Sequence, residues 1–310
     1  MMTEGRTVTK HLTGIVEADQ GLLIVFDEVY NDVTDSIINM INEGKFDNPE
    51  AMIWVIEEFD RYYREAKQAY FEPQGQVLAP VWAKVFELIG AGKPASRQVW
   101  RVSVLEALVL PIIVHMVHDL PLAVANNLIT QPKALQTNLQ DYDRINKQLW
   151  VGLNDVQSRV LAKYSPALIV LSKICGDMDE LILYHLIKLL RGATWYDAIR
   201  LFDIRRKEVE LGRAIKTVLT GDPLDKRIKH YTGQLDQASK RYREVRSSIE
   251  IRTNYYLDFV QNPPWLFLIV KLIFLSLRLC DGLFLTLADL LNRPSPSPHL
   301  AEVHQSELVF

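Results

Sequence analysis

Cysteine is nearly absent from this chain, which has only Cys175 and Cys280 among its 310 residues. The two lie far apart and form no CxxC pair, so the sequence predicts neither a disulfide framework nor a thiolate zinc site. An excess of one charge is also lacking, because 35 basic residues nearly balance 38 acidic ones. The resulting net charge of −3 gives no general attraction to nucleic acid, and we expect no nucleic-acid partner.

Familiar catalytic and targeting motifs are missing as well. The sequence contains no GxSxG, P-loop, GxGxxG or HExxH pattern, which removes the usual signatures of several hydrolase and nucleotide-binding classes. Glu17, Asp19 and Gln20 interrupt the apolar character of the N-terminal region, so we expect no secretory signal. The cytoplasm is therefore the expected compartment.

Helical spacing of apolar residues dominates the sequence. One stripe, at steps of three and four, runs through residues 21–42 and consists of Leu22, Val25, Phe26, Val29, Val33, Ile37 and Ile41. Asn48 and Pro49 match the N-cap and first position of a second helix, which we expect to reach about Tyr70. Further helices are predicted near 78–90, 98–119, 139–163, 165–174, 177–191 and 194–217. Because alternating segments are few, we predict an all-α fold, a multi-helix bundle.

The composition changes near the C-terminus. Residues 225–252 contain eight lysines or arginines against four acids and predict a basic helix. Asn262-Pro263-Pro264 ends that helix, and an apolar amphipathic helix follows over 265–291. We therefore divide the chain into a helical core domain at 1–217, a helical extension at 218–292 with its basic helix at 225–260, and a disordered tail at 293–310.

The apolar helix carries one polar stripe. Lys271, Arg278 and Asp289 lie within about 20° of one another on a helical wheel, close to Asp281 and Gly282. Each central charge would cost roughly 2.5–3.5 kcal/mol inside a bilayer. We therefore expect this helix to bind a membrane surface or to pack on the protein rather than to span. In the packed alternative, its apolar faces are buried and its polar stripe points outward.

The strongest chemical feature is the run His115-Met116-Val117-His118-Asp119. On an α-helix His115 and Asp119 share a face, and His118 lies on the flank of that face, within about 100° of arc. The neighbouring residues are apolar and predict a buried segment, in which these side chains must be hydrogen-bonded, paired or metal-bound. Imidazole and carboxylate are suitable ligands for zinc, iron or manganese. The alternative is a structural hydrogen bond, with Pro121 ending the helix.

Other candidates are less specific. Asp141 is the most plausible further metal ligand from a second helix, and the alternative is that it caps a helix start. Asp60 is expected to pair with Arg61 or Arg64. Arg191 and Trp195 are spaced to stack on one helix face. His185, on an apolar helix, is more typical of a core histidine.

The run His115-Met116-Val117-His118-Asp119-Leu120-Pro121-Leu122-Ala123 resembles the core of an uncharacterised bacterial family of helical proteins, a domain of unknown function, which reads approximately AHInxDLPLA. The match covers roughly residues 20–210 and also rests on Phe26, Tyr30, Thr34, the segment 44–49, Phe59, Tyr62, Trp82, Asp141, Ile145, Asn146, Arg191 and Trp195. That family favours asparagine where His118 stands, so the resemblance supports His115 and Asp119 ahead of His118 as ligands. It implies a helical fold and brings no known activity.

Two functions from different classes follow. The leading interpretation is a helical enzyme or binding protein for a small or lipid-like molecule, with His115 and Asp119 as an acid–base pair or as ligands of a divalent transition metal. The rival is a non-catalytic membrane-associated scaffold. In that interpretation residues 225–291 bring the protein to the inner face of the membrane, and His115–Asp119 is a buried hydrogen bond.

Overall fold

The computed structural model describes residues 21–73, 75–130, 139–145, 162–165, 167, 178–219, 225–264 and 268–291. In these residues the secondary structure is helical without strands, so the all-α prediction is confirmed. The predicted disordered tail at 293–310, and most of the helices predicted at 139–163 and 165–174, lie outside the described residues.

The first two helices begin and end close to where the sequence predicts. Helix α2 spans Leu23–Asn42 and α3 spans Pro49–Phe71. Asn48 caps α3, because its side-chain oxygen accepts a hydrogen bond from the Ala51 N–H at 3.2 Å. Pro49 occupies the first turn, where its missing N–H is not needed. These contacts fix the direction of α3, which carries much of the candidate site.

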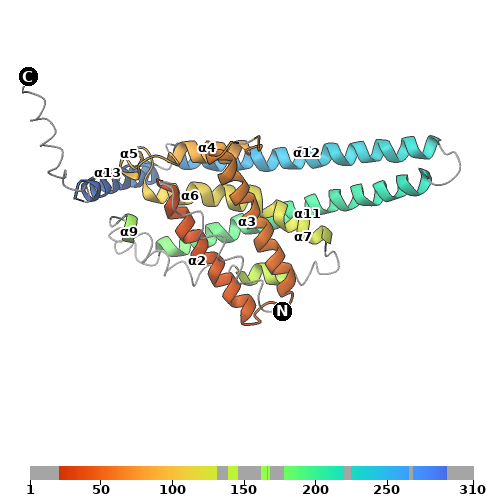
Figure 1. The fold of residues 1–310 in the computed structure, drawn as a ribbon, viewed down its shortest axis with the longest axis horizontal. Coiled ribbons are helices and arrows are strands. Elements are labelled where there is room, and N and C mark those ends of the chain that lie inside the picture. The colour runs from red at the N-terminus through yellow and green to blue at the C-terminus, as the bar shows by residue number, and fades with distance from the viewer. Residues whose placement is uncertain are drawn as a thin grey trace, which may run out of the picture.

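A compact helical run follows. It consists of α4 (Pro80–Ile89), α5 (Ala95–Gln98), α6 (Val104–Val114), a single π-helical turn η2 (His115–Asp119) and α7 (Leu120–Thr130). Ser103 and Glu106 form a reciprocal capping box at the start of α6. Together, α6, η2 and α7 make one continuous helical rod through the centre of the bundle (Figure 1).

The prediction that Pro121 ends this helix is wrong. The N–H of Leu120 bonds to the carbonyl of His115, five residues back, so the backbone makes one wide turn instead of stopping. Pro121 then lies inside the continuous rod, where it has no N–H to donate, and the carbonyl of Met116, five residues before it, accepts a hydrogen bond from the Thr194 hydroxyl at 2.8 Å instead. The helix thus continues through the π turn, and His115, His118 and Asp119 lie within that turn.

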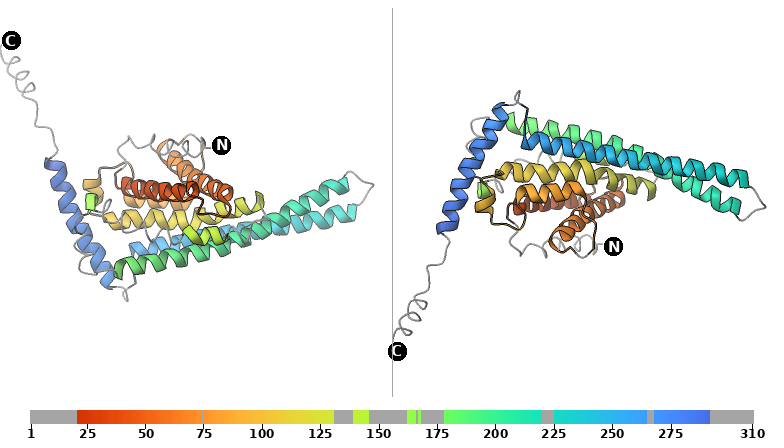
Figure 2. Two further views of the ribbon diagram at one scale, coloured as in Figure 1. Left: turned by 90° about the horizontal axis from the view of Figure 1, so that it is seen from below. Right: turned by 90° about the horizontal axis from the view of Figure 1, so that it is seen from above.

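The C-terminal half is built from long helices. Helix α9 (Ala162–Tyr164) is short, whereas α11 (Met178–Leu219) and α12 (Asp225–Gln261) are long and pack side by side as a hairpin. Helix α11 is continuous where the sequence predicted a break between 191 and 194. The hairpin extends well beyond the bundle, and α13 (Leu268–Leu291) crosses the opposite end (Figures 1 and 2).

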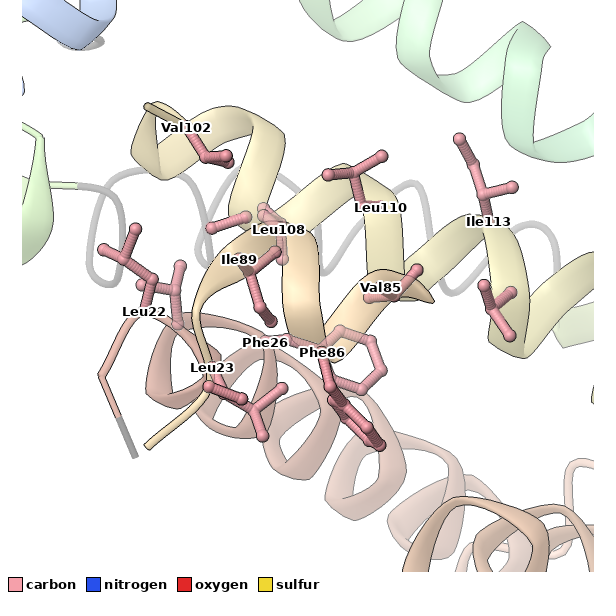
Figure 3. Packing of buried hydrophobic residues seen from close by; sticks show 14 of the residues in the cluster. Leu22, Leu23, Phe26, Val85, Phe86, Ile89, Val102, Leu108, Leu110 and Ile113 are labelled. Carbon is pink, nitrogen blue, oxygen red and sulfur yellow. The ribbon is translucent and has the colours of Figure 1, made fainter. Parts of the chain in front are cut away.

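Two main hydrophobic clusters hold these elements together. Side chains from α2, α4 and α6 meet in the larger one, where Phe26, Phe86 and Leu110 are almost fully buried (Figure 3). Leu257 of α12 and Leu277 of α13 belong to the same cluster. The second cluster joins α3, α7, α11 and α12. At about 1.5–3 kcal/mol for each large apolar side chain, this burial is the main force that assembles the bundle.

The central rod is also the one helical stretch of the described residues that is long and apolar enough to cross a membrane. It spans Val104–Thr130, and 89% of its most apolar window is buried inside the protein. A helix at the centre of a folded core meets the same criterion, so length and composition are weak evidence for a membrane span.

Candidate functional site

The three residues predicted from the sequence meet on the π turn. The Nδ1 atom of His115 lies 3.0 Å from Oδ2 of Asp119, and Nδ1 of His118 lies 2.8 Å from Oδ1. Trp82, from α4, donates its indole N–H to Oδ2 of Asp119 at 2.9 Å. All four residues are buried. We call His115, His118 and Asp119 the His–Asp centre.

The carboxylate of this centre is ionised at neutral pH. Burial acts to raise the pKa of Asp119, but the hydrogen bonds and charges of the two imidazoles outweigh it, so the pKa lies below the usual value of 3.8. An ionised carboxylate can only accept hydrogen bonds, so Nδ1 of each imidazole carries the hydrogen. In the neutral form of either ring Nε2 is then the basic atom, because the partner of one nitrogen fixes the state of the other.

The Nε2 atom of His115 is buried and has no hydrogen-bond partner in the described part of the chain. Its ring stacks on Phe59, with centroids 3.5 Å apart and planes 11° from parallel. Tyr30 meets the ring edge-on at 5.0 Å, and Tyr63 lies 5.7 Å away. A buried polar atom without a partner costs about 1–3 kcal/mol, so native proteins rarely leave one without a reason.

The neighbouring tyrosine hydroxyls are committed elsewhere. Tyr63 donates to Asp27 at 2.5 Å, and Lys67 pairs with the other oxygen of that carboxylate at 2.9 Å. Tyr30 points toward Asp60 at 3.4 Å. Burial raises the pKa of Tyr30 and of Tyr63 well above 10.0, so both remain neutral donors to carboxylates. Their rings, rather than their hydroxyls, face His115.

A family model matches residues 7–221, which is more than half of the chain and includes α2 through α11. The chain belongs to DUF5995, a family of unknown function. No curated protein and no solved structure gives a significant match. The His–Asp centre lies inside the DUF5995 region, whereas α12 and α13 lie beyond it.

The rings around His115 were only partly foreseen. Phe26, Tyr30, Phe59 and Trp82 supported the family resemblance as isolated residues, and in the structure all four have rings within 6.1 Å of the His115 ring. Tyr63 was expected to pack but not to contact His115, because one tyrosine on an amphipathic helix gives no distinctive signal. The DUF5995 region thus gathers residues far apart in sequence around one imidazole.

A half-buried polar group lies on the same helical rod, between α3 and α7. Asn126 donates to Glu58 at 3.1 Å and to the hydroxyl of Tyr62 at 3.2 Å. Burial, the charge of Glu58 and, to a smaller extent, the charge of Asp119 raise the pKa of Tyr62 to about 12. The Tyr62 hydroxyl is therefore neutral at pH 7. No pattern in the sequence pointed to Asn126 as a residue near the candidate site.

Asp141 has a different set of partners. It accepts hydrogen bonds from the backbone N–H groups of Asp47 at 3.0 Å and Asn48 at 2.7 Å, and Arg144 pairs with it at 2.7 Å. It therefore ties down the start of α3, about 16 Å along that helix from Phe59. The structure does not bring Asp141 to the His–Asp centre, and the described residues contain no group of three or more His, Cys, Asp or Glu side chains placed to hold a metal.

The remaining sequence candidates take structural positions. Arg64 pairs with Asp60 at 2.6 Å, one of the two partners predicted. Arg191 lies over the ring of Tyr142 at 4.0 Å, and Trp195 packs on the same ring at 5.1 Å. The side chain of His185 is outside the described part of the chain.

Proposed function

We propose that this DUF5995 protein binds a small, largely apolar molecule against His115. The unpartnered Nε2 atom of His115 carries the proposal. A ligand with a hydroxyl or another hydrogen-bond donor would satisfy that atom, and the rings of Phe59, Tyr30 and Tyr63 would contact its apolar body. The ligand class is therefore a small or lipid-like molecule with one polar end.

The same arrangement supports acid–base chemistry on such a molecule. Asp119 orients His115 through Nδ1 and would stabilise the imidazolium that forms when Nε2 takes a proton. A carboxylate plays this supporting part in many enzymes that use histidine as a general base. Trp82 and His118 hold the carboxylate from two further directions, so His115 is restrained before any ligand arrives.

A divalent transition metal is the second candidate, with zinc, iron and manganese as the suitable ions. The supporting observation is that Asp119 holds the Nδ1 atoms of two imidazoles, as carboxylates commonly do behind metal-binding histidines. In that case Nε2 of His115 would be the ligand. We rank it second because Asp141, the predicted partner, has other contacts.

The two candidates are separated by what purified protein carries. We would extract small molecules from the wild type, His115→Phe and, as a control, His230→Phe, which changes an exposed histidine on α12. Mass spectrometry should find one organic compound in the wild type and the control, and far less in His115→Phe. Metal analysis of the same samples tests the second candidate. The proposal fails if no compound or metal differs among the three, and if no compound in a thermal-shift screen raises the melting temperature of the wild type and the control but not that of His115→Phe.

A further inference from the structure

Helix α13 is turned so that Arg278 and Asp281 face the protein, whereas Lys271 is exposed. Arg278 donates through Nε to Glu106 at 2.8 Å, and a second guanidinium nitrogen pairs with the other oxygen of that buried carboxylate. Asp281 is buried and accepts hydrogen bonds from the Val104 N–H at 3.1 Å and from the hydroxyl of Ser165. The expectation that a packed α13 would point its polar stripe outward is therefore wrong for Arg278 and Asp281.

The apolar face of α13 consequently points outward. Five leucines, which we call the leucine stripe, are more than half exposed: Leu272 at 51%, Leu275 at 60%, Leu279 at 55%, Leu283 at 61% and Leu287 at 57%. They extend about 22 Å along the helix. The other exposed residues in this stretch, Ser276, Cys280 and Phe284, are uncharged. A continuous apolar face of this kind indicates an interaction surface.

The neighbouring surface is basic. Helix α13 packs against α5, and Gly282 lies so close to Trp100 that a Cβ atom there would come within 2.8 Å of the indole. The segment around α5, residues 91–105, contains Lys93, Arg97 and Arg101, all exposed, and no acidic residue. Trp100 is itself exposed. Apolar residues beside basic ones, with tryptophan at the boundary, are typical of helices that lie in a membrane interface.

We propose that α13 lies flat on an anionic membrane surface, with the leucine stripe inserted between headgroups and the basic segment 91–105 contacting lipid phosphates. The outward face, which is uncharged from Leu272 to Leu287, allows insertion, and the basic segment together with the exposed Lys271 at the start of the stripe supplies attraction to anionic lipid. A second copy of the chain fits less well, because a two-fold contact through the stripe would bring two basic segments together. The proposal does not depend on the function proposed for His115.

Vesicle binding tests the leucine stripe. Vesicles of phosphatidylcholine with phosphatidylglycerol should bind the full-length protein, and vesicles of phosphatidylcholine alone should bind it much less. The triple variant Leu275→Glu, Leu279→Glu, Leu283→Glu should bind anionic vesicles at least about tenfold more weakly. A matched control, Leu189→Glu with Ile251→Glu, changes exposed apolar residues elsewhere and should bind as the wild type does. Circular dichroism confirms that each variant is folded.

Two further measurements examine the geometry. Exchanging Arg97 and Arg101 for glutamate should weaken binding to anionic vesicles by about tenfold or more. Cys280 lies on the outward face, so a polarity-sensitive fluorophore on it, in a Cys175→Ser background, should report transfer to an apolar environment when anionic vesicles are added. The same fluorophore on Gln68→Cys, in a background where both native cysteines are serine, should not respond.

Several results would overturn the proposal. It fails if the wild type binds neither kind of vesicle, or if the triple variant binds anionic vesicles as tightly as the wild type does. A wild-type dimer that the triple variant converts to a monomer would identify a second copy as the occupant of the stripe. A monomer whose Cys280 fluorophore is already in an apolar environment without vesicles would show that the chain itself covers this face.

Discussion

Replacing Asp119 with asparagine changes the charge of the His–Asp centre while nearly preserving its shape. The carboxylate accepts three hydrogen bonds, from Trp82, His115 and His118. A hydrogen bond to a charged acceptor contributes about 1.5–3 kcal/mol, against about 0.5–1.5 kcal/mol for a neutral one. The amide also presents an N–H₂ group to one former donor. Three weakened bonds, less the saving from not burying a charge, give a loss of about 3 kcal/mol in the free energy of unfolding at pH 7.

The loss should depend on pH in a defined direction. Burial raises the pKa of Asp119, but its imidazole partners lower the pKa by a larger amount, so the folded-state pKa is below 3.8. A lowered carboxyl pKa stabilises the folded state above the unfolded pKa, and this contribution disappears as the pH falls through the folded value. The difference between wild type and Asp119→Asn should therefore be constant near neutrality and shrink below about pH 4.

Urea unfolding followed by circular dichroism measures this difference, and ¹⁵N NMR of the histidines reports the tautomers. In the wild type His115 and His118 should both carry hydrogen on Nδ1, whereas in Asp119→Asn at least one ring should change. Asp236→Asn, at an exposed position on α12, is the matched control. A variant as stable as the wild type at pH 7, or an unchanged pair of tautomers, would refute the assigned hydrogen-bond network.

Substitutions at other positions test the remaining parts of the fold. Arg278→Met should cost about 3 kcal/mol by urea unfolding, because it leaves Glu106 buried without its cation, and adding Glu106→Gln should recover much of that loss; simple additivity would contradict the pairing. Asp141→Ala should lower the free energy of unfolding by about 3 kcal/mol and leave the metal and small-molecule content of the purified protein unchanged. A fall in metal content would instead identify Asp141 as a metal ligand. Gly90→Ala should cost about 2 kcal/mol, because Gly90 has φ of 63° and a Cβ there would meet a side chain at 2.4 Å. Gly44→Ala, with φ of 70° and open space, should cost only about 1 kcal/mol.

Local signals in the sequence were enough to predict much of the helical framework. Asn48 and Pro49 mark the start of α3 because capping depends on neighbours in the chain, and their contacts are present in the structure. The break expected between 191 and 194 is absent, since α11 is continuous through Gly192. Helix α11 packs against α7 and α12, and these contacts support its helical conformation. The helix propensities of the local sequence do not reveal tertiary contacts of this kind.

The centre of the candidate site was partly predictable for the same reason. The pairing of His115 with Asp119 follows from residues four apart on one helix. The contact of His118 with the same carboxylate depends on the π turn, which spacing on a regular α-helix could not reveal. The rings of Phe59 and Tyr63 come from α3, so their approach to His115 is a result of tertiary folding.

The outward face of α13 was the least predictable feature. A helical wheel divides its residues into polar and apolar sides but does not say which side meets the protein. That choice is made by Glu106, a buried carboxylate on α6 that needs a cationic partner, and Arg278 supplies it. The ion pair between Glu106 and Arg278 thus turns the leucine stripe of α13 toward the outside, although the two residues are far apart in the sequence.

The π turn has a consequence for how the length of this chain can vary. One extra residue is accommodated in η2, because five residues occupy a turn that four would fill in a regular α-helix. Removing Met116 would therefore keep the buried faces of α6 and α7 aligned, while Pro121 would still lie inside the rod without an N–H to donate. The same deletion elsewhere in the rod would rotate everything beyond it by about 100°. The helix can lose a residue at this turn and keep its core, while His115 and His118 would no longer meet the same carboxylate. Deleting one residue can thus remove the His–Asp centre while the hydrophobic core is retained.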